Sequence, residues 1–194
     1  MKSEYYPTEK YGRIFAAMQW ENALALRVGL ETGARIGDIL RLRDGDLRGC
    51  RICYVAEKTG KCMVGELTPQ TAHDLKQNLR NGMYFPGRWG DKPRTRQAVW
   101  KDLKRAVAVT GTKTHVTPHS TRKAFAVDML AAAGLDATQK ALGHTQKAVT
   151  ELYAYSDRQT WSALQVDELA TAIVKKLEQM FGLDKRPPAP YNKK

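Results

Sequence analysis

Residues 117–123 read Thr-Pro-His-Ser-Thr-Arg-Lys. Thr117 is a favourable helix N-cap and Pro118 suits the first helical position, so this stretch predicts the start of a helix. His119 and Arg122 are three residues apart and therefore project from neighbouring points on one face of that helix. A helix N-terminus that carries two cation-capable side chains favours the binding of a phosphate group.

Two further stretches follow this helix start. Residues 142–144 read Leu-Gly-His, and residues 152–155 read Leu-Tyr-Ala-Tyr. Tyr153 follows His144 by nine positions and is a candidate nucleophile. Tyr155 is the alternative, because side chains two residues apart on a helix point about 200° from each other and only one can face a phosphate. Two histidines, an arginine and a tyrosine predict a phosphoryl-transfer site that needs no metal.

Length and composition indicate a globular domain with a polyanionic partner. The chain has 194 residues, which is enough to bury a core, and no apolar run reaches the length needed to cross a bilayer. The start, Met-Lys-Ser-Glu-Tyr-Tyr-Pro, lacks the apolar core of a signal peptide, so we expect a cytoplasmic protein without a membrane segment. The formal charge of +12 favours a nucleic acid, although it also suits an acidic protein or a membrane surface.

The cysteines allow a zinc site on paper. Cys50 and Cys53 form a C-x-x-C pair that Cys62 and His73 complete to four ligands. Residues 50–56 have the pattern of a strand, however, and an odd spacing places the first two cysteines on opposite faces. We therefore predict reduced, partly buried thiols and no metal.

Apolar periodicity predicts a mainly helical chain. The expected helices cover residues 8–18, 20–32, 36–43, 69–80, 94–109 and 158–181. Thr32-Gly33 is the predicted stop of the second helix, and Arg35 follows it directly. Asp38 is placed to orient the Arg35 guanidinium, although a surface ion pair worth at most about 1 kcal/mol is the simpler interpretation.

Strand patterns occupy the stretch between the third and fourth helices. Residues 50–56 and 62–67 alternate in polarity and flank a Lys-Thr-Gly-Lys turn, which predicts a hairpin with a short third strand near 45–47. The fold class is therefore α+β, mainly helical, with a small antiparallel sheet. Lys58 lies at the hairpin tip, where it either reaches a ligand held elsewhere or belongs to an ordinary solvated turn.

The helix over 94–109 carries a basic stripe opposite its apolar face. Its members, Arg94, Lys101, Lys104 and Arg105, suit a phosphate backbone, and an ordinary solvated face is the alternative. Residues 81–93 have the glycines and prolines of a loop. The apolar stripe of residues 158–181 is either core or a docking face, and residues 183–194 are expected to form a flexible tail.

Residues from about 20 to 158 resemble the catalytic domain of the tyrosine recombinase and phage integrase family. The segment Thr32-Gly-Ala-Arg-Ile-Gly-Asp-Ile-Leu-Arg-Leu is similar to the one that bears the family's first catalytic arginine, here Arg35. Lys58 matches the family's catalytic lysine, and His119-Ser-Thr-Arg122 matches its H-x-x-R box. His144 matches the second histidine motif, and Tyr153 stands at the family's usual distance after it.

The resemblance implies a site-specific recombinase or integrase. Arg35 and Arg122 would bind the scissile DNA phosphate, and His144 would donate a hydrogen bond to it. Tyr153 would attack phosphorus with His119 as its base, and Lys58 would protonate the leaving 5′-oxygen. Neither a cofactor nor a metal is implied. A non-cutting DNA-binding regulator and a type IB topoisomerase are the alternatives.

The resemblance also implies partners and boundaries. The partner is double-stranded DNA, on which the family assembles as a homotetramer, with a monomer or weak oligomer expected in its absence. Lys123, which stands where the family often has a histidine, joins the basic stripe as a DNA-binding candidate. The catalytic domain is expected to cover residues 1–182, with helix 158–181 exchanged between protomers and no separate core-binding domain.

Overall fold

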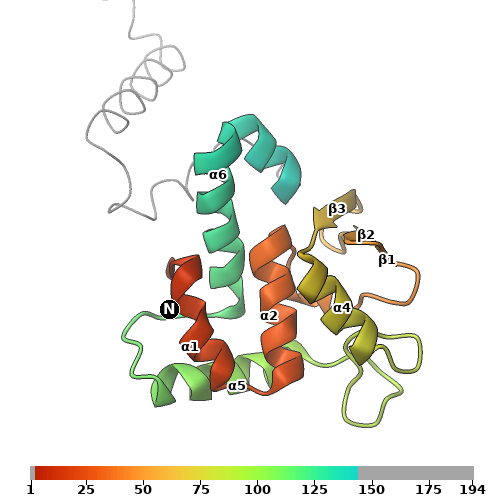
Figure 1. Ribbon diagram of the computed structural model, residues 1–194, viewed down its shortest axis with the longest axis horizontal. Coiled ribbons are helices and arrows are strands. Elements are labelled where there is room, and N and C mark those ends of the chain that lie inside the picture. The colour runs from red at the N-terminus through yellow and green to blue at the C-terminus, as the bar shows by residue number, and fades with distance from the viewer. Residues whose placement is uncertain (1–2, 144–194) are drawn as a thin grey trace, which may run out of the picture. The chain divides into compact units, whose positions relative to one another are not determined.

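The computed structural model describes residues 3–143. They belong to the first of the two units into which the chain divides, Met1–Ser156. Helices and a small sheet follow one another along the chain (Figure 1). In order, the elements are a 3-10 turn at Thr8–Lys10, α1 at Tyr11–Ala16, α2 at Trp20–Thr32, α3 at Ile36–Ile39, β1 at Leu47–Arg48, β2 at Arg51–Val55, β3 at Cys62–Glu66, α4 at Pro69–Asn78, α5 at Arg96–Val109 and α6 at Pro118–Leu142.

Helix α2 is the centre of this unit, and its bounds confirm the helix predicted over 20–32. It lies between α6 and α4, and its residues from Asn22 to Leu26 are all buried (Figure 1). Gly29 permits a close crossing with α6, because a Cβ atom at Gly29 would lie 2.7 Å from the Thr121 hydroxyl. The two helices therefore pack almost backbone to backbone, which sets where α6 begins.

The turn after α2 confirms the predicted stop at Thr32-Gly33. Gly33 has a φ of 65° and caps the helix with its N–H on the Gly29 carbonyl. A side chain at Gly33 would also overlap the Phe125 ring and would lie 2.9 Å from Leu142. Glycine is thus required twice, for its backbone conformation and for space. The chain can then turn sharply and place Arg35 beside the start of α6.

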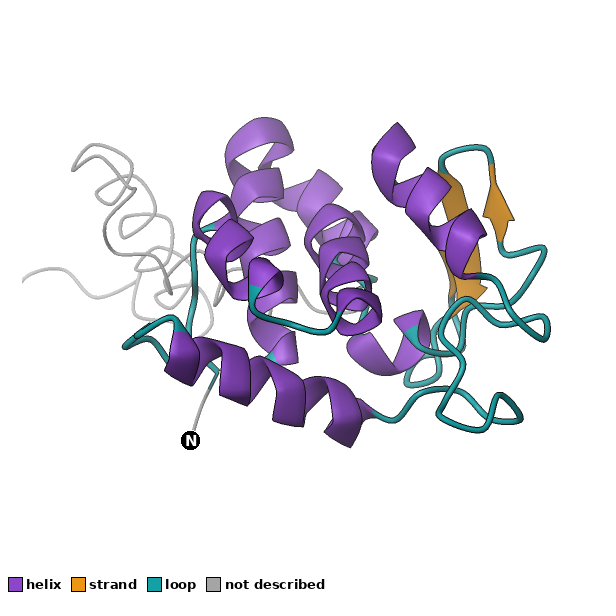
Figure 2. Ribbon diagram, turned by 60° about the horizontal axis from the view of Figure 1, so that its bottom comes forward, coloured by secondary structure: helices purple, strands orange, loops and turns teal. Residues whose placement is uncertain are grey.

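The sheet confirms the predicted hairpin and its short third strand. Its strands are antiparallel in the order β1-β2-β3, with Cys53 opposite Val64 in the register. Figure 2 shows the sheet at one edge of the described residues, next to α4. Gly65 of β3 allows close packing against the end of α2, because a Cβ atom there would lie 2.6 Å from Thr32. The hairpin tip with Lys58 is thereby held near the α2–α3 turn.

Two predicted helices differ most from expectation, while α4 ends two residues early, at Asn78. The helix predicted over 8–18 consists of the 3-10 turn and α1, and the helix predicted over 36–43 is the single turn α3. The chain leaves α3 because Arg43 enters a β-bridge with Met83 and donates its backbone N–H to Asp46 at 2.7 Å. These long-range contacts override the local helical pattern.

Helices α5 and α6 begin at the residues that cap them. Thr95 accepts the Ala98 N–H, so α5 starts at Arg96, two residues later than predicted. Thr117 and Ser120 cap α6 reciprocally, as in a capping box, which confirms the predicted start at Pro118. Helix α6 contains one non-helical residue, Gly134. The predicted helix 158–181 and the tail 183–194 lie outside the described residues.

The cysteines correct one expectation. Cys50, Cys53 and Cys62 are all exposed free thiols, whereas partial burial was predicted. Cys50 lies in the turn before β2, so the alternation of a strand does not apply to it. Cys53 and Cys62 lie on the outer face of the sheet.

Within residues 3–143, the structure contains no helix of the length and apolarity that a membrane crossing requires.

The crowding at Gly33 leads to a stability prediction with a matched control. Gly33→Ala should lower the free energy of unfolding by about 2–4 kcal/mol, because it adds overpacking to the cost of a left-handed backbone. Gly111 has the same φ of 65° and open space around it. Gly111→Ala should therefore cost only about 1 kcal/mol, the backbone part alone. Urea denaturation of both variants checks this, and equal losses would contradict the crowding argument.

Candidate functional site

A cavity of about 260 Å³ lies where four segments of the chain meet. They are the α2–α3 turn, the hairpin tip, the start of α5 and the start of α6. The lining residues are Ala34, Arg35, Ile36, Gly37, Asp38, Glu57, Lys58, Arg96, Pro118, His119 and Arg122. The cavity thus brings together four residues predicted from the sequence, namely Arg35, Lys58, His119 and Arg122.

Arg96 is a further cation of the cavity that the sequence did not single out. It is the first residue of α5, and its side chain crosses Gly37, where a Cβ atom would lie 3.5 Å from the Arg96 Cδ. The only sequence signal was the Thr95 cap, which places the next residue at a helix start. The predicted basic stripe began at Arg94 and therefore passed over it.

Asp38 holds the hairpin and not Arg35, which corrects the predicted pairing. Its Oδ1 accepts a hydrogen bond from Arg41 at 2.8 Å and another from the Glu57 backbone N–H at 3.1 Å. Arg41 also pairs with the Glu57 carboxylate at 2.7 Å. Arg35 is the N-cap of α3 with an extended backbone, and it lines the cavity. Because Asp38 fixes Glu57, it also fixes the neighbouring Lys58.

His119 lies in the first turn of α6, at the mouth of the cavity. Its backbone N–H donates to the Thr117 hydroxyl at 3.2 Å. Burial of the ring, followed by the charges of Arg122, Lys123 and Arg35, lowers the pKa of His119 from 6.5 to about 4, although the residue as a whole keeps an exposed surface. The imidazole is therefore neutral at pH 7 and can accept a proton or a hydrogen bond.

Arg122 is buried, with 3% of its surface exposed. Its guanidinium donates to the Gly33 carbonyl at 2.5 Å and to the Leu142 carbonyl at 2.7 Å. These two bonds connect the start of α6 to the end of α2 and to the C-terminal end of α6 itself. The cation is consequently fixed in position before any ligand arrives.

Tyr54 of β2 lies close to Asp38, Arg122 and Arg35. Burial and the charge of Asp38 raise the pKa of its phenol and outweigh the opposing charges of Arg122 and Arg35, so the pKa is about 12. Tyr54 therefore stays protonated at neutral pH and is a poor nucleophile.

Three members of the predicted basic stripe, Lys101, Lys104 and Arg105, are exposed, whereas Arg94 is turned inward. Arg94 has 17% of its side chain exposed and donates to Asn22 at 3.1 Å. Arg105 donates to Asp102 at 2.7 Å and to the Ala17 carbonyl at 2.6 Å. Both arginines thus bind to the protein itself.

The three predicted lysines differ in their surroundings. Lys101 and Lys104 are exposed on α5, and the Lys104 ammonium lies 5.5 Å from the centre of the Trp100 ring. Lys123 is partly buried, and its ammonium donates to the Ser3 carbonyl at 2.6 Å. Of the stripe, therefore, Lys101 and Lys104 are the members best placed for an external anion.

Two predicted catalytic residues, His144 and Tyr153, lie outside the described residues, as does Tyr155. Between residues 3 and 143, no group of three or more His, Cys, Asp or Glu side chains is arranged to hold a metal ion. The described lining of the cavity favours an anion, because three arginines, a lysine and a helix N-terminus outweigh the carboxylates of Asp38 and Glu57.

The sequence matches known proteins over most of its length. The phage integrase family matches residues 6–160. A tyrosine recombinase XerD from Lacticaseibacillus casei is 28% identical over 144 residues, which cover 66% of this chain and 48% of that protein. The integrase of Escherichia phage P2 is 30% identical over 151 residues, 78% of this chain and 42% of that protein. The chain thus spans about half the length of these relatives or less.

The fold matches solved structures as well. A lambda integrase (75–356) dimer bound to a COC′ core site aligns with a TM-score of 0.72 and 18% identity, covering 84% of this chain and 62% of that chain. XerH bound to its difH substrate in a pre-cleavage complex aligns with a TM-score of 0.66 and 19% identity, covering 88% and 55%. These likenesses establish the predicted recombinase catalytic-domain fold.

The role of Asp38 is testable through stability. Asp38→Ala should lower the free energy of unfolding by about 1–3 kcal/mol, because the Glu57 N–H and Arg41 lose a buried acceptor. Asp44→Ala, at an exposed carboxylate, is the control and should stay within about 0.5 kcal/mol of wild type. Chemical denaturation measures both, and equal stabilities would show that Asp38 does not anchor the hairpin.

The pKa of His119 is testable by NMR. Titration of the free protein should give a midpoint well below 6.5, near pH 4, assigned with a His119→Asn variant. Addition of inorganic phosphate should raise the midpoint, because the anion offsets the charges of Arg122 and Arg35. A midpoint at or above 6.5 in the free protein would contradict this electrostatic account.

Proposed function

Because the chain belongs to the phage integrase family, we propose that it is a DNA recombinase that cuts and rejoins double-stranded DNA through a covalent 3′-phosphotyrosine intermediate. The observation that carries the proposal is the convergence of Arg35, Lys58, His119 and Arg122 on one cavity from three distant segments. A group of cations around a helix N-terminus suits the phosphodiester of DNA.

The two arginines are assigned to the scissile phosphate. Arg35 and Arg122 would donate to its nonbridging oxygens, which carry more negative charge in the transition state than in the ground state. The carbonyls of Gly33 and Leu142 hold Arg122 rigidly, so little reorganisation is needed when the phosphate binds. Since the arginines supply the positive charge, the reaction is expected to proceed without a metal.

The chemical step forms one bond and breaks one bond. The phenol oxygen of Tyr153 attacks phosphorus, its proton passes to the neutral His119, and the bond to the 5′-oxygen breaks. Lys58 donates a proton to that leaving oxygen, which becomes a free 5′-hydroxyl. The 3′-phosphotyrosine keeps the phosphodiester energy, so the reverse step with another 5′-hydroxyl needs no ATP. His144 would donate a further hydrogen bond to the phosphate.

A neutral His119 is the electrostatic part of this proposal. A phenol with a pKa near 10 is a weak nucleophile at pH 7, so it requires a base that is not already protonated. Burial of the ring and, after it, the charges of Arg122, Lys123 and Arg35 favour the neutral state of His119. The bound phosphate weakens this effect and so strengthens the base when it is needed.

The last part of the proposal concerns how protomers assemble on DNA. The similar lambda integrase structure is a dimer on DNA. For this chain, exchange of strands between two duplexes would take four protomers, and the apolar stripe over 158–181 is the candidate contact between them. That segment lies outside the described residues, so the assignment rests on its sequence pattern.

The proposal predicts a protein–DNA adduct with a defined nucleophile. Incubation with supercoiled plasmid in EDTA, followed by an SDS quench, should trap protein on DNA for wild type and for Tyr155→Phe, but not for Tyr153→Phe. Low salt and high protein concentration favour detection. A nicked synthetic duplex serves as the second substrate, because it prevents rejoining and accumulates the adduct.

Lys58 provides the sharper control. Lys58→Ala should slow cleavage about 10²–10⁴-fold, as expected for a lost general acid. A 5′-bridging sulfur at the scissile position should restore the rate, since a thiolate leaves without being protonated. DNA binding without any adduct from either substrate would favour a non-cutting regulator, and an adduct that persists in Tyr153→Phe would overturn the assigned nucleophile.

A further inference from the structure

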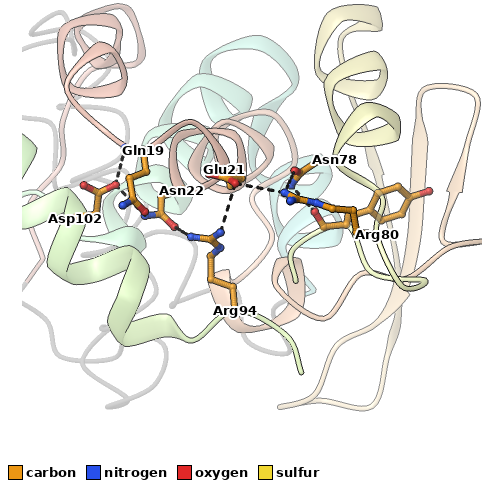
Figure 3. Close-up of polar contacts among 8 residues, drawn as sticks. Gln19, Glu21, Asn22, Asn78, Arg80, Arg94 and Asp102 are labelled. Atoms are coloured by element: carbon orange, nitrogen blue, oxygen red, sulfur yellow. Dashed lines mark hydrogen bonds and ion pairs between the residues drawn. The ribbon is translucent and has the colours of Figure 1, made fainter. Parts of the chain in front are cut away.

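The loop between α4 and α5 is held at both ends by one carboxylate. Residues 79–95 connect α4 to α5. Arg80 at one end and Arg94 at the other both reach Glu21 of α2, at 3.4 and 3.7 Å (Figure 3). Arg94 also donates to Asn22 at 3.1 Å, and Asn22 in turn donates to Asp102 at 2.8 Å. The two ends are therefore fixed to the helical core.

The middle of the loop is also held in one conformation. Pro86 and Pro93 form a β-bridge, and the Gly87 N–H donates to the Lys92 carbonyl at 2.7 Å. Gly90 has a φ of 76°, and its carbonyl accepts a hydrogen bond from the Asn81 side chain at 3.0 Å. Phe85, a residue of the same loop, is fully buried. The tip, residues 87–92, is thus an ordered projection.

This ordered tip exposes a tryptophan. Trp89 has 82% of its surface exposed, the highest value among the exposed large hydrophobic residues of the described part. The Arg88 guanidinium lies 5.1 Å from the centre of the indole ring. A fixed backbone that leaves a large aromatic side chain in water is typical of a binding surface, where tryptophan and arginine contribute most.

The charge of the tip favours nucleic acid over protein. Arg88 and Lys92 outnumber the single acid, Asp91, on a chain of charge +12. An indole offers a flat face to a base or a deoxyribose, and the two cations can bind the phosphates on either side.

The tip is also within reach of DNA held in the cavity. Trp89 and Arg96 are seven residues apart, so their Cα atoms lie within about 25 Å of each other. That distance equals about seven base-pair steps of duplex. Because Arg96 lines the cavity, a duplex with its phosphate bound there is long enough to reach the tip.

We propose that the tip at residues 87–92 is a second DNA contact, in which Trp89 packs against a base or sugar and Arg88 and Lys92 bind flanking phosphates. The contact lies within about seven base pairs of the scissile phosphate. The proposal rests on the function assigned to the cavity, since it needs DNA as the ligand. It adds a contact that takes part in no chemical step.

The test uses the full chain and a fluorescein-labelled 30-base-pair duplex in anisotropy titrations. Trp89→Ala should weaken binding about tenfold, within the range found when a base-stacking ring is removed. Trp89→Phe should keep most of the affinity, because a phenyl ring still stacks. Trp20→Ala, at another exposed tryptophan, is the matched control and should bind as wild type does.

The cations are tested separately through salt. An Arg88→Ala, Lys92→Ala double variant should reduce the slope of log affinity against log salt by about 1.8, the value for two phosphate contacts. Wild-type binding that neither Trp89→Ala nor the double variant changes would overturn the second contact and leave the cavity's function intact. No binding of wild type to the duplex at low salt would overturn both proposals.

Discussion

The buried guanidinium of Arg122 is the interaction on which the site depends. It bonds to the carbonyls of Gly33 and Leu142, which stand at the C-terminal ends of α2 and α6. Helix C-termini carry partial negative charge, so these carbonyls offset the cation that they hold. A buried charge without such partners costs several kcal/mol. One side chain therefore joins three helix ends and presents a positive charge to the cavity.

The other charged residues that line the cavity determine its net charge. Four cations line the cavity, namely Arg35, Lys58, Arg96 and Arg122. Like charges around one cavity repel one another. The buried carboxylate of Asp38 also lines the cavity, and its Oδ1 accepts hydrogen bonds from Arg41 and the hairpin backbone. The cations among the lining residues outnumber the carboxylates of Asp38 and Glu57, so the cavity carries an excess of positive charge that favours an anionic ligand. Any phosphate that binds there also stabilises the folded state through mass action.

The sequence predicted the features that have local causes. The stop at Thr32-Gly33 and the start at Thr117-Pro118 depend on neighbouring residues alone, and both were correct. Ordered motifs also placed Lys58 in the cavity, although the hairpin lies far along the chain from α6.

Partners in space were not predictable in the same way. Periodicity shows which face of α5 a residue occupies, but it does not show what lies opposite. Arg94 and Arg105 have the pattern of a DNA-binding stripe, yet Asn22 and Asp102 are their partners, in the first case across more than 70 residues of sequence. The start of α5 also connects the cavity to the loop that carries the 87–92 tip. Arg94 turns inward and anchors one end of the loop that carries the 87–92 tip, while Arg96 lines the cavity. Because the Thr95 cap lies between them, the same helix start sets the positions of both side chains.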